Sequence, residues 1–298
     1  MAQATALKTY DFNTNRESLS DVIGIVAQDM TPFLSSLKRE KVENTYFEWS
    51  TDDISTGSSN AQIEGADYSF SLDSAPSRTG AYTQIFNKLA KVSKTELAAD
   101  PAGMSDALSY QIEKKLREIA TDVEAALMTG TGNSGASGTA REIKGVVNWI
   151  ATNVETGTGT GSEALTEDMY NDLLQTIWDA GGRPDVTYTN SFNKRKISSF
   201  STSNTRNLEM EAEGRLRNYV SVYESDFGVQ KIELEPFITS SVVAVLQSDL
   251  WALAEMRPIT VEEYPSQGSY TAKIVEGEMG LKSHQEKGSG KITGLTTS

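Results

Sequence analysis

Residues 50–81 are unusually poor in large apolar side chains. The stretch contains only five of them: Ile54, Ile63, Tyr68, Phe70 and Leu72. Serine, threonine, glycine, asparagine and aspartate fill most of the remaining positions. A segment this polar cannot build a core of its own, yet sequence with regular hydrophobic patterns lies on both sides. It is therefore either a disordered insertion or an extended arm that buries its few apolar groups against another molecule.

Strand patterns occur on both sides of this stretch and within it. Residues 45–49 alternate well enough for a strand, and residues 68–72 alternate apolar and polar with period two. Turn-forming residues fill positions 75–80. The apolar spacing over residues 82–96 fits a helix, but β-branched and aromatic residues favour a returning strand. The sequence therefore predicts a long two-stranded arm.

The clearest helical pattern covers residues 101–130. Pro101 and Ser105 suit the start of a helix, and Gly130 suits its end. A helix of this span would be roughly 40 Å long, and a single narrow stripe predicts that it lies across a sheet and exposes its other face. The apolar stripe consists of Leu108, Ile112, Leu116, Ile119, Ala120, Val123 and Leu127.

Shorter patterns surround this helix. The sequence around Thr31 and Pro32 is expected to interrupt any N-terminal helix, with Thr31 extended or in a turn. Glycine-rich residues 130–138 and 156–161 indicate linkers, and residues 143–150 indicate a strand between them.

The remainder of the chain combines helices with a β-rich end. A helix is predicted after the cap residue Thr166, followed by a short strand at residues 185–189 and a helix over residues 190–200. The fold class is therefore α+β with mostly antiparallel strands late in the chain. Six further strands are predicted at residues 219–223, 229–234, 242–246, 250–255, 259–264 and 270–275.

Composition and charge exclude several classes of protein. The 298 residues suffice for one large or two ordinary domains, and the absence of cysteine excludes disulfides and thiolate chemistry. No apolar run approaches the roughly 18 residues of a membrane span, and residues 1–12 have no signal-peptide pattern, so a cytoplasm-like compartment is expected. The net charge of −14, spread along the chain, disfavours nonspecific binding to nucleic acid.

The sequence carries no arrangement of residues that indicates catalysis. Residues 130–135 match G-x-G-x-x-G but follow a helix instead of a strand. His284 is the only histidine and lies in a polar stretch, so a surface role is expected. Residues 52–53 and 262–263 are adjacent acidic pairs, which strands send to opposite faces. We therefore predict no catalytic residue, no cofactor site and no metal site.

The order of elements resembles the major capsid protein of tailed bacteriophages, the Hong Kong 97-type fold. Local sequences at residues 15–21, 29–34, 64–66 and 84–93 are also similar to one phage capsid family. The resemblance covers essentially the whole chain, and its motifs are moderately specific because none is a chemical signature. It implies a structural protein that self-assembles as hexamers and pentamers into an icosahedral-type head enclosing double-stranded DNA.

The resemblance also implies a division of the chain. The expected parts are an N-terminal arm lying on a neighbour (1–45), an extended β-hairpin loop (46–100), a peripheral domain with a spine helix (101–145), an axial domain (146–249) and the return strands of the peripheral domain (250–298). Residues expected to contact other subunits are Phe33, Leu34, Ile63, Tyr68, Phe70, Leu72 and Arg78.

The implied partners are other copies of the chain, a portal and decoration proteins, with DNA packaged without sequence-specific contact and no membrane. The arm begins almost at Met1, so a scaffolding protein is expected to be a separate chain. The implied location is the virion, after assembly in the cytoplasm of a bacterial host. Lys88, Lys91 and Lys94 lie at the base of the predicted arm, so no cross-linking between subunits is predicted.

Three alternatives remain at the level of sequence. The chain could form an encapsulin-like compartment, which a cargo-docking groove would distinguish. It could be a β-rich binding module, such as an adhesin, with a disordered insertion, which would stay sensitive to protease at every concentration. It could also be a hydrolase that uses His284, and the variant His284→Ala would then lose activity.

Overall fold

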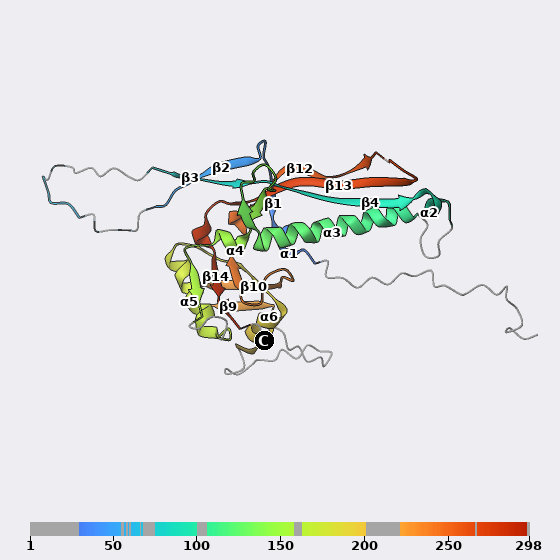
Figure 1. Cartoon of the computed structure of the whole chain (residues 1–298). Coiled ribbons are helices and arrows are strands. Elements are labelled where there is room, and N and C mark those ends of the chain that lie inside the picture. The colour runs from blue at the N-terminus through green and yellow to red at the C-terminus, as the bar shows by residue number, and fades with distance from the viewer. Residues whose placement is uncertain are drawn as a thin grey trace, which may run out of the picture.

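A computed structural model describes residues 30–54, 57, 59, 61–65, 67, 75–99, 106–157, 163–200, 221–265 and 267–296. An elongated layer of sheet and long helix lies above a second, smaller unit, and a hairpin projects from one end of the layer (Figure 1). None of the described helices is long and apolar enough to span a bilayer.

The elongated layer contains a four-stranded sheet with the order β1-β12-β13-β4. One face of the sheet packs against the long helix α3 (Ala107–Thr129). Three short helices lie nearby: α1 (Pro32–Ser36), α2 (Lys94–Ala98) and α4 (Val146–Trp149). The strands of this sheet are β1 (Lys38–Lys41), β12 (Trp251–Tyr264), β13 (Tyr270–Ser283) and β4 (Gln84–Ser93).

Helix α3 confirms the strongest sequence pattern. Its 23 residues give a length of roughly 35 Å. Ile119, Val123 and Leu127 of the predicted stripe are at most 1% exposed, whereas Leu116 is 39% exposed. The helix begins one turn later than predicted, because Asp106 caps it by accepting the Leu108 N–H at 2.9 Å. The predicted start at residues 101–105 lies outside the described residues.

The prediction of a strand over residues 143–150 is wrong, as is that of a linker over residues 130–138. Strands β5 (Thr131–Asn133) and β6 (Glu142–Lys144) form a small hairpin directly after α3. The chain then turns at Gly145 into α4, whose Val146 and Trp149 are buried against α3. Of the apolar side chains in this stretch, Ile143 lies on β6, whereas Val146, Trp149 and Ile150 belong to the turn of helix and its end.

Gly145 makes a close backbone contact that leads to a testable prediction. A Cβ at this position would lie 2.5 Å from the Gly130 backbone nitrogen and 2.8 Å from the Met128 carbonyl oxygen. Because backbone cannot yield as a flexible side chain does, Gly145→Ala is expected to lower the free energy of unfolding by about 1–3 kcal/mol. Gly57, which has no atom within 4 Å of its Cβ position, provides the control. Denaturant titration of both variants should show an effect at Gly145 alone, and equal stabilities would contradict the close contact.

Strands β12 and β13 are longer and more continuous than predicted. The expected strands at residues 250–255 and 259–264 are one strand, β12, with irregular register near Arg257. The expected strand at residues 270–275 continues to Ser283 as β13. β4 pairs with β13 along its whole length, which confirms a strand within residues 82–96, from Gln84 to Ser93. The prediction that this strand returns along the arm is wrong, because the second strand of the arm is β3 (Ser77–Tyr82), where the turn-forming residues predicted a turn.

Pro32 begins a helix instead of preventing one. Proline is tolerated at the first helical position, where its missing N–H has no intrahelical partner, and Thr31 keeps a non-helical conformation. The next two N–H groups donate to the Glu124 carboxylate of α3, Phe33 N at 2.8 Å and Leu34 N at 2.7 Å. A distant carboxylate thus caps α1, which no local pattern could indicate.

The second unit is built on a six-stranded sheet with the order β7-β14-β11-β8-β10-β9. Thr166 caps α5 (Glu167–Asp179) by accepting the Met169 N–H at 3.3 Å, as predicted. α6 (Ser191–Phe200) matches the helix expected over residues 190–200. The strands are β7 (Val154–Thr156), β14 (Gly290–Thr293), β11 (Val243–Leu246), β8 (Val186–Thr189), β10 (Gly228–Leu234) and β9 (Val222–Ser225).

Three features depart from the expected division of the chain. Strand β4 lies within residues 46–100, which were assigned to the extended hairpin loop, but it belongs to the four-stranded sheet. Strand β14 belongs to the six-stranded sheet, although residues 250–298 were assigned to the other unit. Strand β1 pairs with β12, so residues 38–41 belong to the chain's own four-stranded sheet. Antiparallel pairs dominate as predicted, but β1–β12, β8–β10 and β7–β14 are parallel.

Candidate functional site

The extended hairpin, residues 46–82, is the feature that best suits a function outside the subunit. Strands β2 (Tyr46–Thr51) and β3 (Ser77–Tyr82) pair antiparallel in a sheet of their own, from Tyr46 opposite Tyr82 to Thr51 opposite Ser77. The hairpin extends well beyond the rest of the molecule (Figure 1). Ile54 is 98% exposed and Ile63 is 83% exposed. They are the two most exposed large apolar residues in the described part of the chain, and both lie in the loop that joins β2 to β3.

The residues predicted as contacts lie in different parts of the structure. Ile63 lies in the exposed loop, and Arg78 lies on β3, ion-paired with Glu48 of β2. Phe33, however, is only 2% exposed and packs edge-on against Tyr188 at 5.4 Å between ring centroids. Leu34 packs partly against the same core.

The prediction of Phe33 as a contact residue therefore needs correction. Its side chain fills the subunit's own core, because α1 folds back onto α3, and a side chain buried there offers no surface to a second copy. Leu34 is only partly buried and stays a predicted contact. Tyr68, Phe70 and Leu72, together with the strand expected over residues 68–72, lie outside the described residues.

A buried charge cluster fixes the root of the hairpin. Thr83 joins β3 to β4, and its hydroxyl donates to Glu278 Oε1 of β13 at 2.7 Å. Arg141 donates to the same oxygen at 2.7 Å and to the Thr83 carbonyl at 3.3 Å. Arg257 of β12 donates to Glu278 Oε2 at 3.2 Å. Since Glu278 is 4% exposed, one buried carboxylate binds the hairpin root to two strands and to the β5–β6 hairpin.

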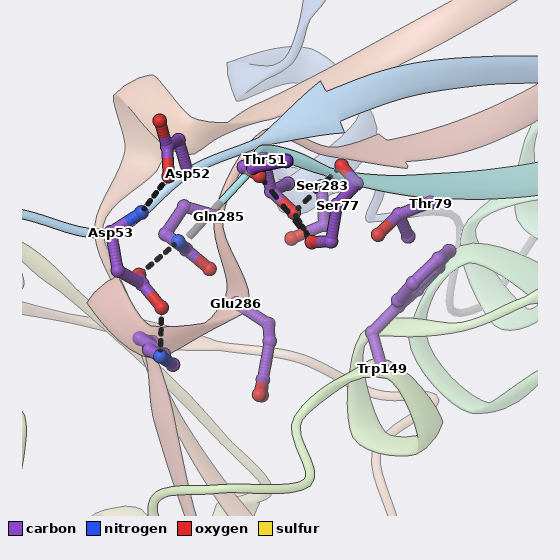
Figure 2. Close-up of a pocket in the computed structure, with 11 residues that line it drawn as sticks. Thr51, Asp52, Asp53, Ser77, Thr79, Trp149, Ser283, Gln285 and Glu286 are labelled. Carbon is purple, nitrogen blue, oxygen red and sulfur yellow. Dashed lines mark hydrogen bonds and ion pairs between the residues drawn. The ribbon is translucent and has the colours of Figure 1, made fainter. Parts of the chain in front are cut away.

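A pocket of about 420 Å³ lies between the hairpin and the body of the subunit. Figure 2 shows Thr51, Asp53 and Ser77 on the hairpin side and Gln285, Glu286 and Trp149 on the body side. Asp53 accepts a hydrogen bond from Gln285 Nε2 at 3.0 Å and forms an ion pair with Lys287. These contacts hold the hairpin at its point of departure from the body.

The hairpin strand also packs on the body through aromatic side chains. Trp49 of β2 lies 5.7 Å from Trp149 of α4, and Phe47 stacks on Trp49 at 5.8 Å. Partial burial and the nearby Glu48 carboxylate raise the pKa of the Tyr46 hydroxyl at the base of β2. The base of the hairpin is therefore anchored to the body. In the loop between its strands, Ile54 and Ile63 stay exposed.

His284 and Lys282 both contact the carboxylate of Glu40 on β1. His284 lies 3.1 Å from Glu40 Oε1, whose carboxylate also accepts from Lys282 at 2.7 Å. The Lys282 hydrogen bond lowers the pKa of Glu40 below its usual value. In the described ranges no group of three or more histidine, cysteine, aspartate or glutamate side chains could hold a metal ion.

The residues that fix the hairpin root were missed at the level of sequence. Glu278 is 195 positions from Thr83 and 137 positions from Arg141. No spacing rule connects residues that far apart. Glu278 lies just beyond the strand predicted over residues 270–275, so no sequence pattern marked it.

Comparison with known proteins gives consistent results. The family described as SU10 major capsid protein matches residues 4–296. The major capsid protein of Escherichia phage Phieco32 is 33% identical over 131 residues, which cover 44% of this chain and 37% of that protein. The chain therefore matches little more than a third of the length of this relative.

Solved structures show the same fold at low identity. The Cyanophage A-1(L) capsid asymmetric unit matches with a TM-score of 0.69 at 13% identity, covering 97% of this chain and 98% of that one. The holo-SrpI encapsulin complex from Synechococcus elongatus PCC 7942 matches with a TM-score of 0.57 at 14% identity, covering 93% of each chain. At these identities the similarity concerns the fold.

Proposed function

This chain belongs to the SU10 major capsid protein family and has the Hong Kong 97-type capsid fold, and we propose that it forms the head shell of a tailed phage. In this proposal copies of the chain assemble as hexamers and pentamers into an icosahedral-type shell around double-stranded DNA. The family is one of structural proteins, and the proposed activity is self-association.

The extended hairpin carries this proposal. An isolated two-stranded hairpin is only marginally stable in water. The extended hairpin also exposes Ile54 and Ile63, so it needs another surface to cover these side chains. A neighbouring copy supplies such a surface at every position of a closed shell. Many modest contacts of this kind give an assembly large total stability through multivalency.

The two units of the subunit suit different places in the shell. We assign the layer of α3 and the four-stranded sheet to the peripheral domain, and the six-stranded sheet with α5 and α6 to the axial domain around each capsomer axis. The extended hairpin then crosses the next subunit of the same capsomer. Because β14 (Gly290–Thr293) pairs within the six-stranded sheet, the return strands of the peripheral domain end before residue 290.

The proposed partners follow from this role. They are other copies of the chain, a separate scaffolding protein, a portal and decoration proteins, and the assembled protein is part of the virion after assembly in the bacterial cytoplasm. The net charge of −14 would let packaged DNA slide past the inner wall instead of adhering to it. A strongly basic inner face in an assembled shell would contradict this last point.

Electron microscopy of the full chain, purified alone and co-expressed with a candidate scaffolding protein, tests the proposal. Closed shells with hexameric and pentameric capsomers are the expected result. Uniform monomers under every condition, with the scaffold present, would overturn it. Limited proteolysis adds a second measurement, because the extended hairpin should become protected on assembly.

An encapsulin-like compartment is the second candidate, and one observation favours considering it. The SrpI encapsulin structure has the same fold over most of both chains. The contents of shells isolated from the native host distinguish the two functions. Double-stranded DNA inside the shell supports the phage head, whereas a protein cargo without DNA supports the compartment.

A further inference from the structure

Two buried carboxyl groups meet where three parts of the subunit join. Glu124 projects from α3, and Glu235 follows β10 of the six-stranded sheet. Both residues are 0% exposed, and the two carboxyl groups lie close enough to interact, while Glu235 Oε2 is buried without a donor among the described residues. Glu235 Oε1 accepts the Phe237 N–H at 3.1 Å, and the Glu235 backbone N–H donates to the Thr189 carbonyl at 2.9 Å.

The hydrogen bonds of the pair require a proton on Glu235. Both oxygens of Glu124 already accept backbone N–H groups, from Phe33 and Leu34, which favours the ionised form of Glu124. If Glu235 were ionised as well, its Oε2 would have no donor among the described residues. A proton on this oxygen instead lets it donate to Glu124. Two like charges buried in contact are too costly for both groups to ionise.

Within the described ranges, the groups around the pair supply no compensating positive charge. Tyr188 of β8 faces both carboxyls, and its hydroxyl lies 3.1 Å from Ser36 of α1. Glu233 of β10 is ion-paired with Lys231, and Lys194 of α6 donates to the Ile232 carbonyl at 2.7 Å. Among the ion pairs of the described residues, none involves Glu124 or Glu235.

The electrostatic consequences agree with this geometry. Burial raises the pKa of Glu235 to about 9, and the adjacent Glu124 carboxyl adds to the shift. Burial also raises the pKa of Glu124, although its hydrogen bonds oppose the shift. Burial raises the pKa of Tyr188 to about 12, so this hydroxyl stays neutral where Glu235 titrates. A pocket of about 300 Å³ borders Glu235, lined also by Met30, Leu234 and Ser240, and provides a route for the proton.

We propose that the Glu124–Glu235 pair is a proton-dependent joint, in which one bound proton holds the six-stranded unit against α3 and the capped helix α1, and alkaline pH loosens that contact. When Glu235 loses its proton, the hydrogen bond between the carboxyls becomes a repulsion across the boundary between the two units. α1 remains attached to Glu124, so the loosened part is the segment after β10. This inference concerns the subunit alone and does not depend on the proposed shell.

The pH dependence of stability tests the joint. The folded-state pKa of Glu235 lies above the ordinary value of 4.5. Its contribution to stability is therefore fully present below about pH 4.5 and is lost as pH rises to about 9. Between about pH 6 and about pH 8, the unfolding constant of the wild-type chain should rise about tenfold per pH unit relative to that of Glu235→Gln. Denaturant titration of the full chain at several pH values measures this ratio.

Glu233→Gln is the matched control, because it removes a carboxylate two positions away that is paired with Lys231. This variant should keep the wild-type pH dependence. A ratio between wild type and Glu235→Gln that does not change with pH would overturn the proposal.

A measurement on the unmodified chain decides the question even where Glu235→Gln fails to fold. Infrared spectra in D₂O should show the carbonyl stretch of a protonated carboxylic acid at neutral pH, and the band should disappear as pH passes about 9. Hydrogen exchange at Phe237, corrected for its intrinsic pH dependence, should accelerate over the same range. Absence of the acid band at neutral pH would overturn the proposal.

Discussion

Replacing both Ile54 and Ile63 with aspartate is expected to abolish shell assembly while leaving the stability of the folded subunit unchanged. The two side chains are 98% and 83% exposed, so the subunit loses almost no internal contact when they change. In a shell, full burial of each isoleucine against a neighbour would contribute about 1.5–3 kcal/mol. This loss of burial free energy occurs at every subunit of the shell, and each aspartate adds the cost of taking a carboxylate out of water.

Sedimentation and electron microscopy measure the assembly of this double variant, and thermal denaturation measures the subunit. Glu64→Gln is the control, because it changes the charge of the same exposed loop without removing apolar surface. It is expected to assemble like the wild type. Shells of the double variant that form at the wild-type protein concentration would show that the loop is not a docking element. A lowered melting temperature of the unassembled double variant would show that the loop contributes to its own subunit.

The long helix and the first strand of the hairpin could be predicted because their signals are local. The stripe of α3 repeats every three to four residues, and burial alternates along β2. The second strand, β3, could not be predicted, because its sequence is rich in turn-forming residues. The polarity of residues 50–81 also pointed to a segment without a core of its own. The structure adds the direction of the hairpin and the exposure of Ile54 and Ile63.

The predictions that failed depend on contacts between distant residues. Residues 143–150 have strand-like composition, but close packing of Gly145 on the Gly130 and Met128 backbone turns the chain into α4. Phe33 appeared to belong to an arm on a neighbour, yet Glu124, 91 positions away, caps α1 and brings Phe33 into the core. Composition and hydrophobic periodicity do not show which distant residues come into contact, so the two carboxyl clusters at Glu278 and Glu124 could not be predicted.

Substituting Glu278 by alanine is expected to lower the free energy of unfolding by about 3–5 kcal/mol, the usual cost of removing one partner from a buried ion pair. The carboxylate is 4% exposed and accepts from Thr83, Arg141 and Arg257. Its loss leaves the Thr83 hydroxyl with only the long 3.4 Å bond to the Thr45 carbonyl, and the Arg141 guanidinium, whose side chain is 29% exposed, without its counter-charge. Denaturant titration of the full chain measures the change.

Glu276→Ala is the matched control, since Glu276 lies on the same strand and bonds the same Arg257 at 2.7 Å. Its ion pair is more exposed, with 50% exposure at Arg257 and 28% at Glu276, so the expected loss is at most about 1 kcal/mol. Equal losses from the two substitutions would show that burial of Glu278 is not what gives the cluster its strength.

Comparing Glu278→Ala with Glu276→Ala also tests whether the Glu278 cluster fixes the direction of the hairpin, apart from its effect on subunit stability. Glu278 binds Thr83, the residue between β3 and β4, so its loss should free the hairpin root even at temperatures where the subunit stays folded. A hairpin that samples many directions loses more conformational entropy when it docks on a neighbour. Glu278→Ala should therefore need a higher protein concentration to assemble than Glu276→Ala, at a temperature well below the unfolding of both. Assembly of both variants at the same concentration would mean that the cluster stabilises the subunit without directing the hairpin.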